Sequence, residues 1–216
     1  MSAELSWDPR VLARYEHALW AGTPLHVRDD QGTTLPFDVA RWLRAPDAAD
    51  ETLLARCTGP TLDVGCGPGR LIAALAARGV PALGVDVART AVAIARACGA
   101  LALHRSVFEH LPGAGRWQIA LLADGNIGIG GNAAGLLTRL HELLRPGGQA
   151  LIEVEDDDEV AVFTATVTGA DGSALATFPW ARIGALPLID LAVPLGFQVA
   201  DRWASTGRQF VALARR

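Results

Sequence analysis

A short apolar stretch contains one acid and is followed by three glycines, a combination that can bind a ligand. Asp63 lies within residues 61–64, and Gly65, Gly67 and Gly69 come after it at alternate positions, before an Ala- and Leu-rich segment that begins near Arg70. Glycines at the carboxyl end of a strand let backbone N–H groups approach a ligand that a Cβ would exclude. Asp63 would repel an anionic pyrophosphate and attract an ammonium group. The stretch therefore predicts a site for a ligand with a cationic end.

The spacing of these glycines argues against a nicotinamide dinucleotide. The dinucleotide fingerprint G-x-G-x-x-G, started at Gly65, requires a glycine at position 70, where this chain has Arg70. A tight structural turn without a ligand is the remaining alternative for the stretch.

A second acid follows the next expected strand. Asp86 ends the apolar stretch 82–85, 21 residues after Gly65, and Val87 and an expected helix over 89–97 come next. An acid at such a strand end can accept two hydrogen bonds from the hydroxyls of a ribose. The alternative is that Asp86 caps the following helix.

Two stretches together resemble one enzyme family. Residues 61–70 resemble the first motif of the class I S-adenosylmethionine-dependent methyltransferases, and Leu143-Leu144-Arg145-Pro146-Gly147-Gly148 is similar to a later motif of the same family. The resemblance implies that Asp63 faces the amino group of the methionine moiety and Asp86 the ribose. It also implies that the glycine turn makes room for the cofactor, through Gly65, Cys66, Gly67 and Gly69.

The resemblance extends to two later loops. Alignment on Leu111-Pro112 puts Val107 where family members commonly have an acid that faces adenine. We therefore expect a backbone N–H near Val107 or Phe108 to contact the base. Glu109, next in the chain, is the candidate to replace the missing acid. The loop after the fourth strand implies Asp124 and Asn126 beside the sulfonium. Family members that methylate amino groups of nucleic acids or glutamine carry Asn/Asp-Pro-Pro-Tyr/Phe in this loop. This chain lacks that motif, which argues against those substrates.

The fold class follows from the order of elements. From residue 61 onward apolar strands and helices alternate, which is typical of a doubly wound α/β sheet. The resemblance implies a mostly parallel seven-stranded sheet with the order 3-2-1-4-5-7-6 and an antiparallel C-terminal hairpin, expected over 197–204 and 209–213. We expect residues 1–60 to be an accessory cap that contains a small hairpin over 25–29 and 33–37, and residues 61–216 to form the cofactor-binding domain. Within that domain we expect a strand over 149–154, a hairpin inserted at about 160–180 and a short helix over 189–195.

Composition narrows the function. The 216 residues carry a net charge of −4, and all 19 basic residues are Arg. Without Lys, the chain cannot hold pyridoxal phosphate as a Schiff base or build a P-loop. The sequence contains no basic run interleaved with aromatics, which favours a small-molecule substrate over nucleic acid.

The remaining features predict a soluble protein. No run of about 18 residues lacks charge, and Met1-Ser2-Ala3-Glu4 does not resemble a secretory signal, so we expect no membrane partner and a cytoplasmic location. Three cysteines, at 57, 66 and 98, are expected to be reduced. The acidic stretch 153–159 forms no compact metal-ligand pattern, so no metal is expected.

The sequence predicts an S-adenosylmethionine-dependent methyltransferase for a small molecule, with S-adenosylhomocysteine as product. The alternatives are a non-catalytic protein that binds either compound and an NAD-dependent oxidoreductase. No catalytic base is identified, the methyl acceptor and its reacting atom stay open, and the protein is expected to be a monomer or a homodimer. The N-terminal residues Tyr15, His17 and His26 and, in the inserted hairpin, Phe178, Trp180 and Arg182 are further candidates for the site.

Overall fold

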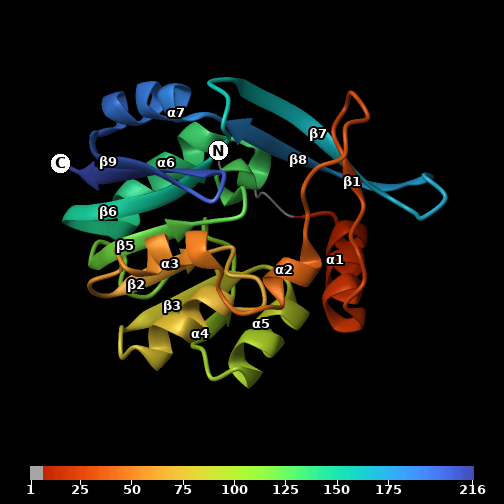
Figure 1. The fold of residues 1–216 in the computed structure, drawn as a ribbon, viewed down its shortest axis with the longest axis horizontal. Coiled ribbons are helices and arrows are strands. Elements are labelled where there is room, and N and C mark those ends of the chain that lie inside the picture. Colours follow the sequence, from red (N-terminus) through yellow and green to blue (C-terminus); the bar gives the residue numbers. More distant parts are fainter. Residues whose placement is uncertain (1–6) are drawn as a thin grey trace.

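A seven-stranded sheet forms the centre of the computed structural model, which describes residues 7–216 (Figure 1). Its order is β4-β3-β2-β5-β6-β10-β9. The strands are β2 (Thr61–Val64), β3 (Ala82–Asp86), β4 (Ala102–His104), β5 (Trp117–Leu122), β6 (Leu144–Val154), β9 (Phe197–Ser205) and β10 (Arg208–Arg215). The first five are parallel, and β10 is antiparallel to both β6 and β9. This confirms the predicted order and the C-terminal hairpin. The Met1-Ser2-Ala3-Glu4 segment lies outside the described residues.

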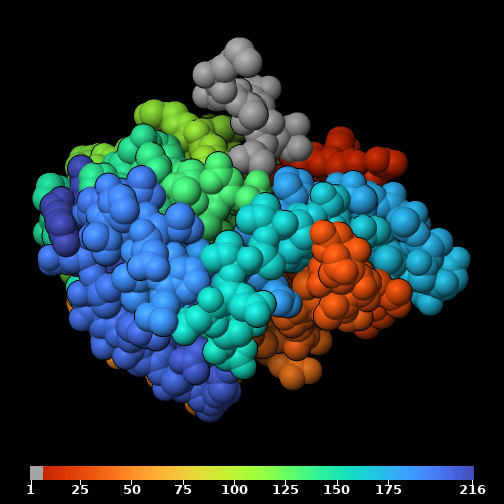
Figure 2. All heavy atoms as spheres, turned by 90° about the horizontal axis from the view of Figure 1, so that it is seen from above, coloured from red at the N-terminus to blue at the C-terminus, as the bar shows by residue number. Residues whose placement is uncertain are grey.

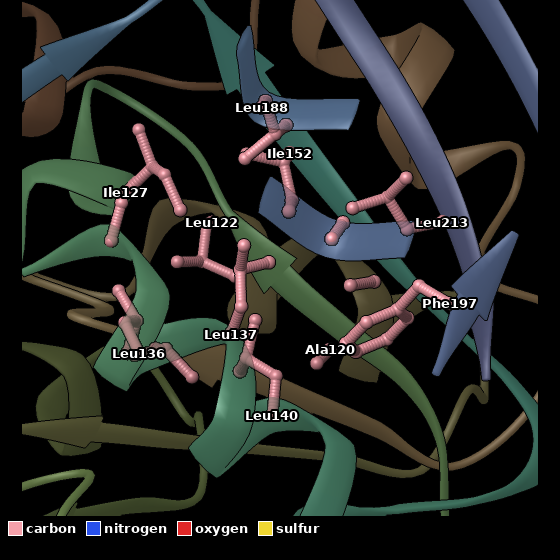
Figure 3. Packing of buried hydrophobic residues seen from close by; sticks show 14 of the residues in the cluster. Ala120, Leu122, Ile127, Leu136, Leu137, Leu140, Ile152, Leu188, Phe197 and Leu213 are labelled. Atoms are coloured by element: carbon pink, nitrogen blue, oxygen red, sulfur yellow. The ribbon is translucent and has the colours of Figure 1, made fainter. Parts of the chain in front are cut away.

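Helices cover both faces of this sheet. The helices α3 (Ala48–Leu54) and α4 (Arg70–Ala77) pack on one face, and α6 (Ala133–Leu143) and α7 (Ala185–Ala192) pack on the other. Figure 3 shows the second of these interfaces, where Leu137 of α6 lies beside Leu122 of the sheet and Leu188 of α7 lies beside Ile152. Leu136 and Leu140 of α6 are fully buried in the same core. Burial of these leucines holds α6, and with it the loop in front of it, against the carboxyl half of β5.

A second, three-stranded sheet lies beside the main one, with the order β1-β7-β8. It consists of β1 (Val27–Arg28), β7 (Val160–Thr168) and β8 (Ala174–Ile183). Figure 2 shows the orange N-terminal residues against the cyan and light-blue hairpin, in agreement with the pairing of Val27 with Val167. The N-terminal segment and the inserted hairpin therefore form one structure around a shared apolar core.

The hairpin expected within residues 25–37 forms, but it is short. Arg28 and Thr34 make an isolated antiparallel bridge, with the N–H of Leu35 donating to the carbonyl oxygen of Val27 at 2.9 Å and that of Asp29 to Thr33 at 3.0 Å. On its other edge β1 pairs with β7, whose unpaired N–H and C=O groups accept it, and Val27 is completely buried. The local hairpin thus joins the second sheet through β1.

Several boundaries also differ from expectation. Strand β6 begins at Leu144 rather than at 149, and α7 begins at Ala185 rather than at 189, with Pro187 in its first turn where a missing N–H costs nothing. The inserted hairpin extends to Ile183. These shifts leave the order of the elements unchanged.

Three further α-helices complete the described structure. They are α1 (Pro9–Ala21), α2 (Val39–Trp42) and, on the edge nearest α1, α5 (Arg89–Ala97). Asp8 caps α1 by accepting a hydrogen bond from the N–H of Arg10, and Gly22 ends it in the left-handed conformation. Within residues 7–216, no helix combines the length and the apolar character that crossing a bilayer requires.

Candidate functional site

A cavity at the carboxyl ends of β2, β3 and β5 gathers the predicted residues. Its walls come from the glycine turn after β2, the ends of β3 and β4, the loop after β5, helices α1 and α2, and strand β8. Ten of the eleven predicted cofactor residues line it: Asp63, Gly65, Cys66, Gly67, Asp86, Val87, Val107, Phe108, Asp124 and Asn126. Residues from four separate loops thus meet in one place, as parallel strands require.

The glycine turn is shaped by its neighbour Asn126. Gly65 and Gly67 have φ values of +71° and +54°, a region that other residues rarely adopt. The Asn126 side-chain amide donates hydrogen bonds to the carbonyl oxygens of Val64 and Gly65, each at 2.9 Å. A Cβ on Gly65 would lie 2.8 Å from that amide nitrogen. The loop after β5 is therefore fastened directly to the turn.

Gly69 has a different role from the one expected. It does not line the cavity, and a Cβ at this position would lie 2.6 Å from the Cβ of Ala95 in α5. With φ at +86° it also starts helix α4 in a left-handed conformation. Gly69 thus allows α4 and α5 to pack closely.

Asp63 is a buried carboxyl group with altered acidity. Its exposed fraction is 2%. Burial raises the pKa of Asp63 to about 7, against the opposing effect of Arg70, and the carboxylates of Asp124 and Asp86 raise it further. An ammonium group placed beside Asp63 would favour its charged form and would itself gain a partner. The side chain is thus suited to a cationic ligand.

Asp86 combines a structural and a potential ligand role. One carboxylate oxygen accepts a hydrogen bond from Gly67 N at 2.9 Å, and the other accepts one from Ala88 N at 2.8 Å. Burial raises the pKa of Asp86 to about 6, although these backbone hydrogen bonds lower it. Each oxygen keeps a second lone pair, so the carboxylate can still accept hydrogen bonds from two hydroxyls.

The loop after β4 forms an apolar wall. Val107 and Phe108 line the cavity beside Val87, and the N–H of Phe108 lies 3.3 Å from the Ser106 hydroxyl oxygen, to which it donates. Glu109 does not line the cavity: its side chain is 62% exposed and lies 3.6 Å from Arg105. The substitute acid for adenine is therefore not supplied by Glu109.

Sequence reasoning missed a group of charges beneath the cavity, which we name the arginine–carboxylate cluster. It comprises Arg41, Asp47, Asp50, Arg70, Asp124, Glu153 and Arg208. Arg70, which lines the cavity, donates to Asp50 at 2.8 Å and to Asp124 at 2.6 Å. Partners up to 161 residues apart in sequence, as Arg208 and Asp47 are, leave no local signal in the chain.

Asp124 and Arg70 are the two members of this cluster that line the cavity. The resemblance implies that Asp124 lies beside the sulfonium. It has a φ of +56°, and its N–H donates to Glu153 at 2.6 Å, which holds that conformation. Burial raises the pKa of Asp124, and Arg70 and Arg41 oppose the shift. Arginines from α2, α4 and β10 thus surround the carboxylate of Asp124, while β6 holds its backbone N–H.

The cap side of the cavity is aromatic. Tyr15 of α1 lines it, as do Phe178 and Trp180 of β8, whereas Arg182, His17 and His26 do not. Burial raises the pKa of Tyr15 well above its usual value, so its hydroxyl is neutral. Trp7, Phe37 and Trp42 complete this wall and were not singled out from the sequence.

The acidic stretch 153–159 does not line the cavity, although its first residue, Glu153, belongs to the arginine–carboxylate cluster. Residues 156–159 are exposed, and Asp158 accepts a hydrogen bond from the N–H of Leu186 at the start of α7. Among the described residues no group of three or more His, Cys, Asp or Glu side chains is arranged to hold a metal ion.

Comparisons with known proteins show which folds and sequences this chain is similar to. Residues 61–148 match the family model described as a methyltransferase domain. No curated protein matches the chain in sequence. A structural search finds an S-adenosylmethionine-dependent methyltransferase from Bacteroides fragilis, solved with S-adenosyl-L-homocysteine. Its TM-score is 0.75 at 22% identity, covering 100% of this chain and 98% of that one.

Two further structures are similar. One is the 1,6-didemethyltoxoflavin N1-methyltransferase of Burkholderia thailandensis, with a TM-score of 0.64 and 22% identity over 100% of this chain and 93% of that one. The other is a glycopeptide N-methyltransferase complexed with S-adenosyl-L-methionine, with a TM-score of 0.60 and 17% identity over 80% of this chain and 95% of that one. Residues 61–148 are therefore similar to a methyltransferase domain, and the chain has the fold of the class I S-adenosylmethionine-dependent methyltransferases.

Proposed function

We propose that this protein transfers a methyl group from S-adenosylmethionine to a small molecule and releases S-adenosylhomocysteine. The observation that carries the proposal is the placement of Asp63 and Asp86 at the ends of adjacent strands, on either side of a glycine turn, in one cavity. S-adenosylmethionine carries an ammonium group, which Asp63 can face, and a ribose, which Asp86 can bind. The B. fragilis and B. thailandensis structures, both with S-adenosylhomocysteine bound, support the choice.

Each part of the cofactor has a proposed neighbour. Asp63 faces the methionine amino group, and Gly65, Cys66 and Gly67 pass beneath the methionine chain. Asp86 accepts hydrogen bonds from the ribose, and Val87, Val107 and Phe108 hold adenine between apolar surfaces. Asp124 and Asn126 lie beside the sulfonium.

The bound cofactor supplies a methyl group that is already activated by its positive sulfur. The protein therefore has to align the acceptor in line with the S–CH₃ bond and keep water out. Among residues 7–216 no His or Lys lines the cavity, and burial keeps both the Tyr15 hydroxyl and the Cys66 thiol protonated by raising the pKa of each. We propose that these side chains orient the reactants and do not remove the acceptor's proton.

We also propose that two parts of the chain have different roles. Residues 61–216 bind the cofactor, and the accessory segment 1–60 covers the cavity together with the hairpin inserted at about 160–180. The support is that α1, α2 and β8 each contribute to the cavity wall, and that β1 pairs with β7.

Calorimetry with S-adenosylmethionine, S-adenosylhomocysteine and NAD tests the cofactor. We expect both sulfur compounds to bind, and Asp63→Ala and Asp86→Ala each to weaken binding by about 1–3 kcal/mol, as for a lost charged hydrogen-bond partner. Asp190→Ala, in α7 and outside the cavity wall, is the matched control. Binding of NAD without S-adenosylmethionine would refute the proposal, as would unchanged affinity in both variants.

Turnover separates an enzyme from a binding protein. Candidate small molecules are incubated with S-adenosylmethionine, and formation of S-adenosylhomocysteine is measured. A protein that binds the cofactor but never forms this product is the non-catalytic alternative.

A further inference from the structure

Aromatic side chains are concentrated at the cavity. Of the thirteen aromatic residues of the chain, seven line it. Phe108 belongs to the loop after β4, and the other six come from the N-terminal segment and from β8. We name these six the aromatic box: Trp7, Tyr15, Phe37, Trp42, Phe178 and Trp180.

The six rings form one continuous set of contacts. Tyr15 meets Trp42 edge-on, with ring centroids 5.9 Å apart, and Trp42 meets Phe37 at the same distance. Phe37 contacts Trp180 at 5.4 Å and Phe178 at 6.0 Å. Trp7 stacks on Phe178 at 5.1 Å. Because neighbouring rings hold one another at fixed angles, the box presents flat apolar surfaces of defined orientation.

The box joins the cofactor end of the cavity at two points. A Cβ on Gly67 would lie 3.3 Å from the Tyr15 hydroxyl, so this ring reaches the glycine turn. Ile129, in the segment η1 (Asn126–Gly131), lines the cavity and packs against both the box and the core of the main sheet. A molecule in the box would therefore lie next to Asp124 and Asn126, where the methyl group is proposed to be.

The charges around the cavity are paired or lie away from the box. Arg70 is held by Asp50 and Asp124, and Arg105 donates to the carbonyl oxygen of His110 and lies near Glu109. Among the described residues these are the two basic side chains of the cavity wall. A carboxylate or phosphate on the acceptor would lose its hydration without gaining a cation.

We infer that the methyl acceptor is a planar, uncharged aromatic or heteroaromatic molecule that stacks in the aromatic box. This inference rests on the proposed function and adds the class of its substrate. The acceptor's nucleophilic atom (oxygen, nitrogen or sulfur) points toward Asp124 and Asn126. Its lone pair forms the bond to the methyl carbon while the S–CH₃ bond breaks and leaves its electron pair on sulfur. The proton of the acceptor atom passes to bulk water as the methylated product leaves the cavity.

A matched set of probes tests the inference. The protein is saturated with S-adenosylhomocysteine, and calorimetry compares 2-naphthol, its saturated counterpart decahydro-2-naphthol, and 2-naphthoate. We expect 2-naphthol to bind at least ten-fold more tightly than either of the others, because only it is both flat and uncharged.

Variants locate the probe. Phe37→Leu and Trp42→Leu should each lower the affinity for 2-naphthol at least five-fold. Trp20→Leu, at a tryptophan that is 79% exposed, should leave it unchanged. Thermal melting and S-adenosylhomocysteine affinity show that each variant is folded.

The outcomes separate the two proposals. If the cofactor binds but 2-naphthol and decahydro-2-naphthol bind with equal affinity, the inference about the acceptor is refuted while the proposed function stands. The same conclusion follows from tighter binding of 2-naphthoate, no 2-naphthol binding, or full affinity in both box variants. If neither S-adenosylmethionine nor S-adenosylhomocysteine binds, the proposed function fails and the inference fails with it.

Discussion

Arg41 of helix α2 lies 3.0 Å from Asp124, with Nη1 of the arginine facing Oδ1 of the carboxylate. The other oxygen of Asp124 accepts a hydrogen bond from Arg70 at 2.6 Å. One carboxylate thus joins the segment that covers the cavity to the helix that follows the glycine turn. Arg41 also lies 3.3 Å from Asp50, which is 1% exposed, so the cap is anchored to the buried part of the arginine–carboxylate cluster.

Removing the charge of Arg41 should loosen the cap. Arg41→Met keeps the apolar stem but leaves Asp124 and Asp50 with one partner fewer, so the free energy of unfolding should fall by about 1–3 kcal/mol. Urea denaturation measures it. Arg44→Met, at an exposed position two residues after α2, is the control. Equal stability of the two variants would show that Arg41 does not anchor the cap.

The charge of Asp124 should distinguish the two forms of the cofactor. Asn tolerates the φ of +56° at this position, so Asp124→Asn tests the charge with little change in backbone. A carboxylate near a sulfonium favours S-adenosylmethionine over S-adenosylhomocysteine, whose sulfur is neutral. We expect the variant to lose about 1 kcal/mol of that preference, or roughly five-fold in relative affinity. Calorimetry with both compounds measures this ratio, and an unchanged ratio would place the sulfonium away from Asp124.

Cofactor affinity should depend on pH through Asp63. With the pKa at about 7, much of the carboxyl group is protonated at and below neutral pH, and it must release that proton to face an ammonium. Affinity for S-adenosylmethionine should therefore rise with pH between about 6 and 8, by up to ten-fold per unit below the pKa. Asp63→Asn should flatten this part of the profile. Calorimetry in buffers of different ionisation enthalpy detects the released proton, and no proton release would contradict the assignment.

The same group should affect stability without ligand. The pKa of Asp63 is about 7 in the folded protein and near 3.8 in the unfolded chain, so the folded state binds more protons between these values. Its contribution to stability is therefore present below about pH 4 and is lost as pH rises to about 7. Relative to wild type, Asp63→Asn should gain stability between pH 4.5 and pH 8, by up to the order of 4 kcal/mol. Denaturation at both pH values measures it, and a constant difference would rule out a shifted pKa.

Gly69 should matter for packing more than for conformation. Gly69→Ala adds a Cβ 2.6 Å from that of Ala95 at a φ of +86°, whereas Gly79→Ala, at +72°, meets nothing within 4 Å. Both variants bear the strain of a left-handed residue, about 1–2 kcal/mol. Overpacking should cost Gly69→Ala a further 1–3 kcal/mol or so. Comparable melting temperatures for the two would show that α4 and α5 can move apart.

The sequence by itself determined the main sheet and the cofactor side of the site. Strands, helices and turns there follow one another at short range, so the pattern around Asp63, Asp86 and Asn126 predicts their shared location once the sheet is parallel. The sequence predicts the same role for Gly69 as for Gly65 and Gly67, because spacing alone does not distinguish a glycine that faces a ligand from one that faces Ala95.

Only the tertiary structure decided how the cavity is covered and charged. Val27 pairs with Val167, Arg208 meets Asp50, and Trp7 stacks on Phe178, each across more than 100 residues. Such contacts depend on burial and on which edges and charges remain unpaired after the sheet has formed, and no local pattern records them. For this reason the chain's sequence indicates the methyl donor, while the wall that would select the acceptor became visible only in three dimensions.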